Sequence, residues 1–345
     1  MDYQILTSVP DQQTARAWNE CLDDCEHAAQ YTAPEFFVEP YFKDRQPFAI
    51  LAIRKGAVHG LVTGLLENRR IICGAPGSPH LCLRRNADAD AVGKTLAAGL
   101  RAHASPSAEF ISLFSWTDIS ALRDDGFRAR AFGVPLCTIL LDLSKGADML
   151  FREFSETRRN KIRRAIKARV EVTEMDVGQD FDKYYDLYTD WCRFKHIERQ
   201  PYDRQRAVFE SRGNRLCLVA RHEGQIVGVS TFRYRRPGII EYAANVSRRE
   251  ETRTRQNDLL LWRGIEWAVQ QGDLRYFSMA GAHFFLQKFG GHPSMTYRYS
   301  LDRTPLRRYH AAESARAAVT RAYQALPDRA RQALRTLLRR GESGD

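Results

Sequence analysis

The order of predicted elements between residues 215 and 301 constrains the fold most strongly. Three apolar, β-branched runs at residues 215–222, 225–234 and 239–246 are separated by turn residues and predict a three-strand meander. A polar loop, 247–256, then leads to a helix over residues 257–271, which Gly272 ends. A strand at 274–279, a short helix at 283–289 and a last strand at 295–301 follow. This order predicts a unit that combines strands with helices.

The preceding part of the chain also alternates strands and helices. Strands are expected at residues 48–53, 58–66, 110–114 and 137–143, with a helix at 89–104. A helical section then begins near residue 144 and includes an aromatic-striped helix at 181–194, a pattern typical of core packing. We therefore expect an N-terminal unit at residues 1–143, a second unit at 144–302 and a helical tail at 303–345.

The net charge of +11 is concentrated in two segments. Residues 152–169 carry eight basic and two acidic side chains, and residues 303–345 carry ten arginines and four acids, so the remaining chain is nearly neutral. In the first segment Ile162, Ala165 and Ile166 are predicted to face the core, which leaves the basic residues on a solvated helix face. The second half of the tail predicts a basic amphipathic helix. It can dock on an anionic membrane, or pack back as a helical cap.

Cysteine usage and the N-terminus indicate the compartment. Seven cysteines lie at irregular spacing without a CxxC pair, which argues against a disulfide framework and against a zinc site, so no metal is expected. The first residues lack the basic and apolar regions of a signal peptide, and no apolar run is long enough to span a bilayer. We expect a cytoplasmic protein, with peripheral contact at the inner face of the membrane through the tail.

Three segments in this order carry a resemblance to a known family: SETRRNKIRRAIKARVEV, NDLLLWRGIEWAVQQG and FFLQKFGG. Over residues 45–301 the chain resembles the FemAB-like acyl and aminoacyl transferases, which carry two GNAT-like units in tandem. The resemblance implies an α/β (α+β) fold, with two mixed, mostly antiparallel sheets flanked by helices. It also implies an N-acyltransferase that uses an acyl-CoA donor, acetyl-CoA first among them, and an amine acceptor such as an amino sugar or a cell-envelope precursor.

The resemblance implies a donor site on the strand 239–246 and at the start of the helix that follows. Backbone near Glu241 and Tyr242 would flank the acyl-pantetheine arm, and a helix N-terminus would receive the phosphates. The implied donor-binding residues are Ala244, Asn245, Val246, Arg253, Arg255, Gln256, Asn257, Asp258 and Phe289.

The implied catalytic residues are Lys288, Glu241 and Tyr242. Lys288 can stabilise a tetrahedral oxyanion or position a phosphate, and Glu241 is the motif's candidate base. The competing interpretations are an exposed helix lysine and a solvent-facing strand glutamate. His196 and His283 are alternative bases, each more typical of a lone structural histidine.

Two departures from the family pattern affect these roles. The stretch from Arg253 to Asp258 contains no glycine, although glycine normally lets backbone approach a pyrophosphate, so guanidinium groups would have to replace backbone amides there. Leu286 occupies the position at which related enzymes often have a tyrosine general acid. The loop at residues 74–79, rich in glycine and proline, can line an acceptor groove between the two units.

Two further functions remain open at this point. The donor can be an aminoacyl-tRNA, which predicts steeply salt-dependent binding through the two basic segments, although no long heptad segment is present. Alternatively, the chain is a non-catalytic envelope-associated binding protein in which the glycine-free loop marks a lost activity. The amine acceptor itself can be a small molecule or lipid-linked.

Overall fold

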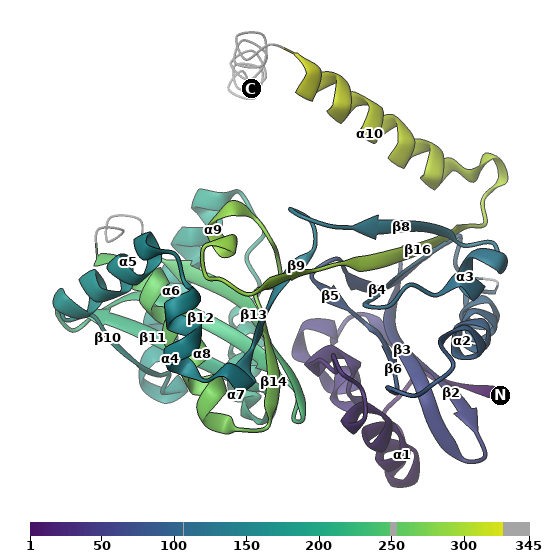
Figure 1. Cartoon of the computed structure of the whole chain (residues 1–345), viewed down its shortest axis with the longest axis horizontal. Helices are drawn as coiled ribbons and strands as arrows, with labels where there is room; N and C mark the ends of the chain where they lie inside the picture. Colours follow the sequence, from purple (N-terminus) through teal and green to yellow (C-terminus); the bar gives the residue numbers. More distant parts are fainter. Residues whose placement is uncertain (106, 249–253, 327–345) are drawn as a thin grey trace. The chain divides into compact units, whose positions relative to one another are not determined.

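In this computed structural model, residues 1–300 form one body that contains two β-sheets and the helices packed on them (Figure 1). Residues 301–345 form a second unit. The structure describes residues 1–105, 107–248 and 254–326. Many strand pairs are antiparallel, whereas β13 pairs in parallel with β14, and β4 and β6 each pair in parallel with β7. The predicted mixed sheets flanked by helices are therefore present.

The first sheet has the order β1-β2-β3-β4-β7-β16-β8, with two short strands, β5 and β6, paired beside this path. Its strands are β1 (Asp2–Leu6), β2 (Gln46–Arg54), β3 (Ala57–Glu67), β4 (Arg70–Ala75), β5 (Ser78–Pro79), β6 (Leu81–Leu83), β7 (Phe110–Ser115), β8 (Arg128–Phe132) and β16 (Thr296–Asp302). Helix α1 (Gln12–Asp23) packs on the face that carries Ala49 and Leu51. Helix α2 (Ala89–Ala104) covers the opposite face, where Gly99 lies against Ile50. A short helix, α3 (Ser120–Asp124), follows β7.

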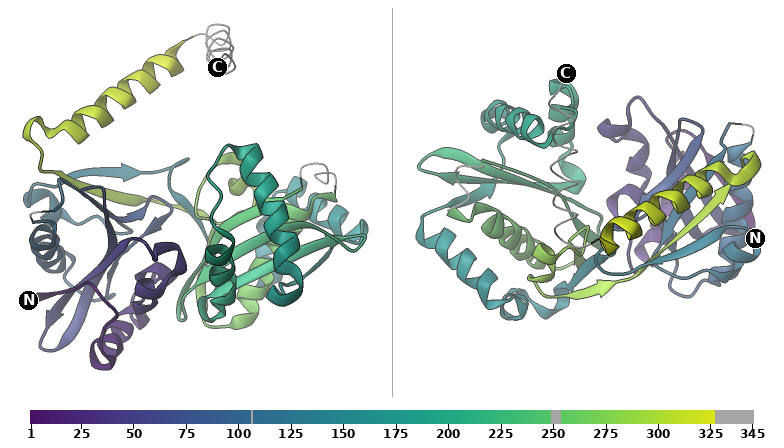
Figure 2. Two further views of the ribbon diagram at one scale, coloured as in Figure 1. Left: turned by 180° about the vertical axis from the view of Figure 1, so that it is seen from behind. Right: turned by 90° about the horizontal axis from the view of Figure 1, so that it is seen from above.

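The second sheet has the order β10-β11-β12-β13-β14-β9-β15. Its strands are β9 (Thr138–Asp142), β10 (Glu171–Glu174), β11 (Arg215–His222), β12 (Gln225–Tyr234), β13 (Gly238–Ser247), β14 (Leu274–Ser278) and β15 (His292–Ser294). One face packs against α4 (Ala147–Glu153), α5 (Glu156–Lys167), α8 (Gln256–Gln271) and α9 (Phe284–Gln287). The other face packs against α6 (Val177–Lys195) and α7 (Tyr202–Glu210), which the view from behind in Figure 2 brings forward.

The two sheets exchange strands. Strand β9 lies within the N-terminal part of the sequence but pairs with β14 and β15 of the second sheet. Conversely β16, at the end of the body, pairs with β8 and lies between β8 and β7 in the first sheet. Both strands can be followed in Figure 1. The predicted boundary at residue 143 stays a prediction, and this pairing links the segments on either side of it.

In the tail, a single turn of 3-10 helix (Pro305–Arg307) precedes α10 (Arg308–Ala325). The hydroxyl of Thr304 accepts a hydrogen bond from the backbone N–H of Arg308, the first residue of α10, at 3.0 Å. The predicted second tail helix falls on residues 327–345, outside the described residues. No described helix is both long and apolar enough to cross a membrane.

Candidate active site

Strands β13 and β14 separate at the centre of the second sheet. They pair in parallel only from Gly238 to Glu241, and Glu241 lies opposite Ser278, the last residue of β14. Strand β13 continues to Ser247, with a register shift against β12 that leaves Ala243 without a cross-strand partner. Such a bulge bends a strand and leaves backbone groups unpaired. Ala243 and Ala244 are exposed, so this stretch of the strand is accessible from solvent.

Polar side chains beyond this point meet on the α8 side of the sheet. The Tyr242 hydroxyl is in hydrogen-bond contact with Ser230, and Asn245 Nδ2 donates to Ser230 Oγ at 2.8 Å. Asn257, in the first turn of α8, donates from Nδ2 to Ser247 Oγ at 3.1 Å. Burial raises the pKa of Tyr242, which keeps its hydroxyl protonated and able to donate at neutral pH.

The N-terminus of α8 follows directly from this group. Arg255 precedes the helix in the left-handed conformation, with φ of 59°. Glycine adopts this backbone conformation readily, but here an arginine adopts it. The chain therefore turns into the helix without a glycine at this position. Arg253, the neighbouring predicted phosphate ligand, lies outside the described residues.

A buried ion pair anchors this helix end. Arg158 of α5 donates to the carboxylate of Asp258, and the two side chains are only 3% and 7% exposed. The Arg158 guanidinium also stacks on Phe285, 3.8 Å from the ring centroid, and lies 5.1 Å from that of Phe289. The charge of Arg158 is neutralised by Asp258, so neither side chain is free to bind a ligand. Their contacts instead hold the start of α8 against α5 and the α9 segment.

Three further cations surround this ion pair. Lys161, on the next turn of α5, has a lowered pKa, mainly because of burial and then because of Arg158, Arg255 and Lys288, with Asp258 opposing the shift. Lys288 caps α9, with its Nζ 4.1 Å from the Phe284 ring centroid. Lys161, Arg255 and Lys288 are all half-buried. We call these three side chains the cation cluster. They are suited to binding phosphate oxygens at the first turn of a helix.

The remaining predicted donor ligands have mainly structural contacts. The Gln256 side chain is 1% exposed and bonds Thr254 and the backbone of Val227. Val246 packs against α6, and Phe289 is fully buried against Phe154.

Glu241 lies on the opposite face of the sheet from Tyr242 and the cation cluster. Its carboxylate is fully buried, 3.4 Å from Nη2 of Arg233 on the neighbouring strand, and no described group hydrogen-bonds to either oxygen. Arg233 stacks on Tyr31, 4.0 Å from the ring centroid, and Arg215 beyond it pairs with Glu39. Glu241 is therefore part of a buried charged row (Arg215, Arg233, Glu241) where the second sheet contacts residues 31–39, rather than a solvent-facing residue.

The structure thus brings six of the twelve predicted site residues together. Tyr242, Asn245, Asn257, Asp258, Arg255 and Lys288 converge on the α8 N-terminus, while Glu241 does not. His196 ends α6 and His283 begins α9, both exposed. The loop at residues 74–79 contacts the segment that follows β14, since a Cβ on Gly77 would lie 2.5 Å from the oxygen of Ala280.

Sequence reasoning missed Arg158, Lys161, Ser230 and Phe285. Arg158, Ile162 and Ala165 recur at the spacing of one helix face, and all three are buried. An arginine on the buried face of this helix was the sequence signal that could have revealed the role of Arg158. The prediction for Ile166 was wrong, because this residue was expected to face the core and is 51% exposed. No group of three or more potential metal-binding side chains occurs among the described residues.

The fold and this geometry define a tandem protein with two GNAT-like sheets. Among solved structures, FemX has a TM-score of 0.67 at 11% identity, with 90% of this chain and 99% of that chain covered. A tandem GNAT protein from the clavulanic acid biosynthesis pathway has a TM-score of 0.55 at 12% identity, covering 88% and 99%. The C-terminal domain of a putative lysylphosphatidylglycerol synthetase from Agrobacterium fabrum has a TM-score of 0.54 at 13% identity, covering 89% and 96%.

These likenesses confirm the predicted FemAB-like fold of tandem GNAT units. No protein-family model and no curated protein matches the chain in sequence.

Proposed function

We propose that the protein is an acyltransferase that moves an acyl group from an acyl-CoA-type donor, acetyl-CoA first among the candidates, to an amine acceptor. The observation that carries the proposal is the cation cluster, Lys161, Arg255 and Lys288, around the first turn of α8. It lies beside the point where β13 and β14 separate. A diphosphate would bind at the helix end while the acyl arm follows the exposed backbone at Ala243 and Ala244.

The reaction needs few protein groups once the donor is placed. A base first takes the extra proton of the acceptor's ammonium form, and the neutral amine nitrogen then attacks the thioester carbonyl carbon. A C–N bond forms, the C–S bond breaks, and the one proton that the nitrogen loses on becoming an amide goes to the leaving sulfur. The protonated Tyr242 hydroxyl or the Lys288 ammonium can donate to the developing oxyanion or to the sulfur. Glu241 remains our candidate base. Its carboxylate is buried on the face of the second sheet that contacts residues 31–39, so the amine proton would have to reach it from that face.

Donor binding by calorimetry tests the proposal. The purified protein is expected to bind acetyl-CoA or a longer acyl-CoA, and Lys161→Ala or Lys288→Ala should weaken binding by about tenfold, because each removes a charge-assisted bond. Lys167→Ala is the matched control, since Lys167 is an exposed lysine at the end of the same helix. Absence of binding for every acyl-CoA in the panel would exclude this donor class.

A second function is favoured by one observation, the exposed basic residues of α5 and the turn after it. Arg163, Arg164, Lys167 and Arg169 are all exposed there. If the donor is an aminoacyl-tRNA, these residues would contact its phosphate backbone, and the affinity would fall steeply with salt. Binding of tRNA that does not change between low and high salt contradicts this alternative.

The acceptor in either case is an amine, with an amino sugar or a lipid-linked envelope precursor as the leading classes. Membrane contact through the tail is part of the proposal for a lipid-linked acceptor. Removal of residues 303–345 should then release the protein from anionic vesicles in a sedimentation assay. Unchanged sedimentation would mean that the tail has no such role.

A further inference from the structure

An open pocket of about 590 Å³ lies beside the first sheet, away from the cation cluster. Its lining includes Cys25 to His27, the segment after β6 and the residues that follow β7. Strands β6 and β7 are parallel, with Leu81 opposite Ser115, and α2 connects them. The pocket therefore lies outside the carboxyl ends of two parallel strands, the position at which open α/β sheets bind ligands.

This arrangement repeats that of the second sheet. There, β13 and β14 are parallel and α8 connects them, and the cation cluster lies at the start of α8. In the first sheet Arg84 and Arg85 follow β6 and precede α2. The side chain of Asp88 accepts the backbone N–H groups of Asp90 and Ala91, so the helix end itself is already capped. Any anion in this pocket would therefore depend on the two arginines rather than on the helix N-terminus.

Both arginines are held in place by backbone bonds and keep their side chains available. The Arg84 N–H donates to the oxygen of His59 at 3.0 Å, and the Arg85 N–H donates to that of Asp24 at 3.3 Å. Neither guanidinium has an ion pair with a carboxylate within the described part of the chain. Nε of Arg84 is buried, and no described acceptor bonds to it.

Aromatic rings form the other wall of the pocket. His27 stacks between Trp116, at 4.7 Å between centroids, and Tyr276 of β14, at 5.4 Å. Burial is the main cause that lowers the pKa of His27 to about 4, so the imidazole is neutral at pH 7. The indole Nε1 of Trp116 is buried and donates to no described group. Glu26, the one acid among the described residues that line the pocket, accepts a hydrogen bond from the Tyr276 hydroxyl at 3.0 Å. Hydrogen-bond donors and a ring surface thus predominate.

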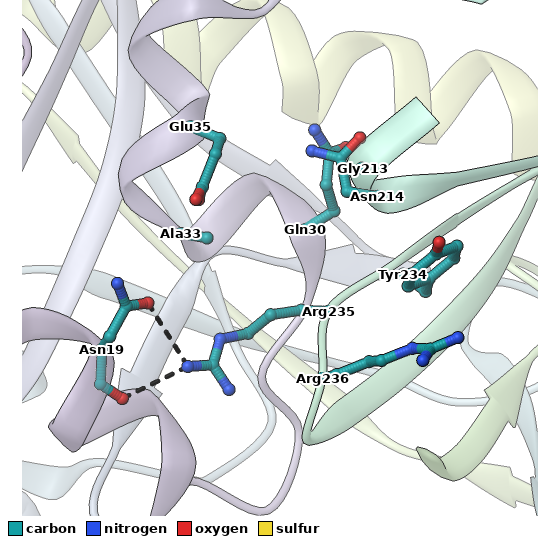
Figure 3. A pocket seen from close by; sticks show the side chains of 9 residues that line it. All are labelled: Asn19, Gln30, Ala33, Glu35, Gly213, Asn214, Tyr234, Arg235 and Arg236. Atoms are coloured by element: carbon teal, nitrogen blue, oxygen red, sulfur yellow. Dashed lines mark hydrogen bonds between the residues drawn. The ribbon is translucent and has the colours of Figure 1, made fainter. Parts of the chain in front are cut away.

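The pocket drawn in Figure 3 provides a contrast. It has a volume of about 390 Å³, and its buried cation, Arg235, donates to Asn19, to Asp23 and to the oxygen of Pro237. Its guanidinium holds residues 19–23 against the turn between β12 and β13. A phosphate in that pocket would have to compete with these partners, whereas no carboxylate of the described residues pairs with Arg84 or Arg85.

We propose that the pocket of Arg84, Arg85, His27 and Trp116 binds a phosphate-bearing small molecule with a ring, and that this molecule is the amine acceptor. The arginines would hold the phosphate, the Trp116 N–H would donate to it, and the ring would lie against the aromatic wall. Tyr276, which stacks on His27 in the pocket, belongs to β14 and lies two residues before Ser278. The pocket is therefore close to the point where β13 and β14 separate. The assignment as acceptor rests on the proposed acyltransferase function, while phosphate binding does not.

Calorimetry with glucosamine 6-phosphate, glucosamine, ADP and UDP as probes tests the pocket. At least one phosphorylated probe is expected to bind, and glucosamine is expected to bind at least about tenfold more weakly than its phosphate, because the charge-assisted bonds are lost. The double variant Arg84→Ala/Arg85→Ala should weaken binding at least about tenfold. Arg16→Ala, at an exposed arginine of α1, should bind as the wild type does. Trp116→Phe keeps a ring but removes the N–H, and should weaken binding as well.

Donor binding measured on the same variants separates the two proposals. Acyl-CoA should bind the double variant with unchanged affinity, because Arg84 and Arg85 lie outside the cation cluster. If a sugar phosphate or nucleotide binds through the arginines while no acyl-CoA binds, the pocket stands and the acyltransferase proposal fails. If no phosphorylated probe binds the folded protein, or the double variant binds as tightly as the wild type, the pocket proposal is overturned.

Discussion

At the scale of single residues, the ion pair of Arg158 and Asp258 has the largest predicted energetic effect in the candidate site. Both side chains are almost fully buried. Removing one partner of such a pair leaves an uncompensated charge, which typically costs about 3–5 kcal/mol. Asp258→Ala should therefore lower the free energy of unfolding by that amount, as measured by urea denaturation with circular dichroism.

The double variant Arg158→Met/Asp258→Leu provides the control. Apolar replacement of both partners restores a neutral, packed site, so it should recover most of the stability lost in Asp258→Ala. If the double variant were as unstable as the single one, packing of the α8 end rather than its charge would explain the loss.

A second residue-scale prediction concerns His80, which is 8% exposed and packs edge-on against Tyr31 and Phe36. Burial lowers its pKa from 6.5 to about 3. The unfolded chain therefore binds a proton below pH of about 6.5 that the native state does not accept until about pH 3, so stability falls as the pH is lowered through this window.

Between pH 7 and pH 5, this single group should cost about 2 kcal/mol of folding free energy. His80→Phe keeps a ring at this position and removes the titration. The difference in unfolding free energy between wild type and variant, measured at both pH values, isolates the contribution. An identical pH slope in the two proteins would mean that His80 is protonated in the native state as readily as in the unfolded one.

The family resemblance, rather than local pattern alone, indicated candidate site residues. It placed Asn257 and Asp258 at the start of a helix and Lys288 within FFLQKFGG, and these residues lie near one another. The role of Arg158 was missed because a basic run normally lies on a solvated face. Its partners, Asp258 and Phe285, are more than 90 residues away in the sequence, so only tertiary packing reveals them.

At the scale of elements, close packing of α8 on the sheet gives a direct test. Gly264 lies against the ring of Phe232, and a Cβ added there would be 2.4 Å from it. Gly264→Val should cost about 1–3 kcal/mol, since overpacking shifts a fully buried ring, and thermal denaturation would measure the loss. Gly178→Ala in α6 is the control, because its Cβ would meet its nearest neighbour at 3.4 Å.

The elements that the sequence predicted well are those with a clear hydrophobic period. Helix α2 and strands β11 and β12 have the predicted ends. Strand β8 was missed because its sequence, RARAF, buries only Phe132 and so carries no apolar alternation. Strands β5 and β6 were missed because they have only 2 and 3 residues and lie in a stretch rich in glycine and proline.

At the scale of the whole molecule, the exchange of β9 and β16 was beyond prediction from local pattern. Both segments were predicted as strands, at residues 137–143 and 295–301, but hydrophobic alternation does not specify which sheet a strand joins. Pairing decides this: β9 hydrogen-bonds β14 and β15, and β16 hydrogen-bonds β8. Each half of the sequence thus completes the sheet of the other half.

This exchange predicts that the halves do not fold separately. A fragment of residues 144–302 lacks β9, so the edge of β14 and the short β15 would lose their shared partner, and β16 would have no sheet to join. Unpaired edges and exposed apolar strands favour aggregation over folding. We expect the fragment to show no cooperative unfolding transition, and expect residues 1–143 alone to show none either. Co-expression of the two should restore both the transition and acyl-CoA binding. A cooperative transition in the isolated 144–302 fragment would show that the second sheet is stable without β9.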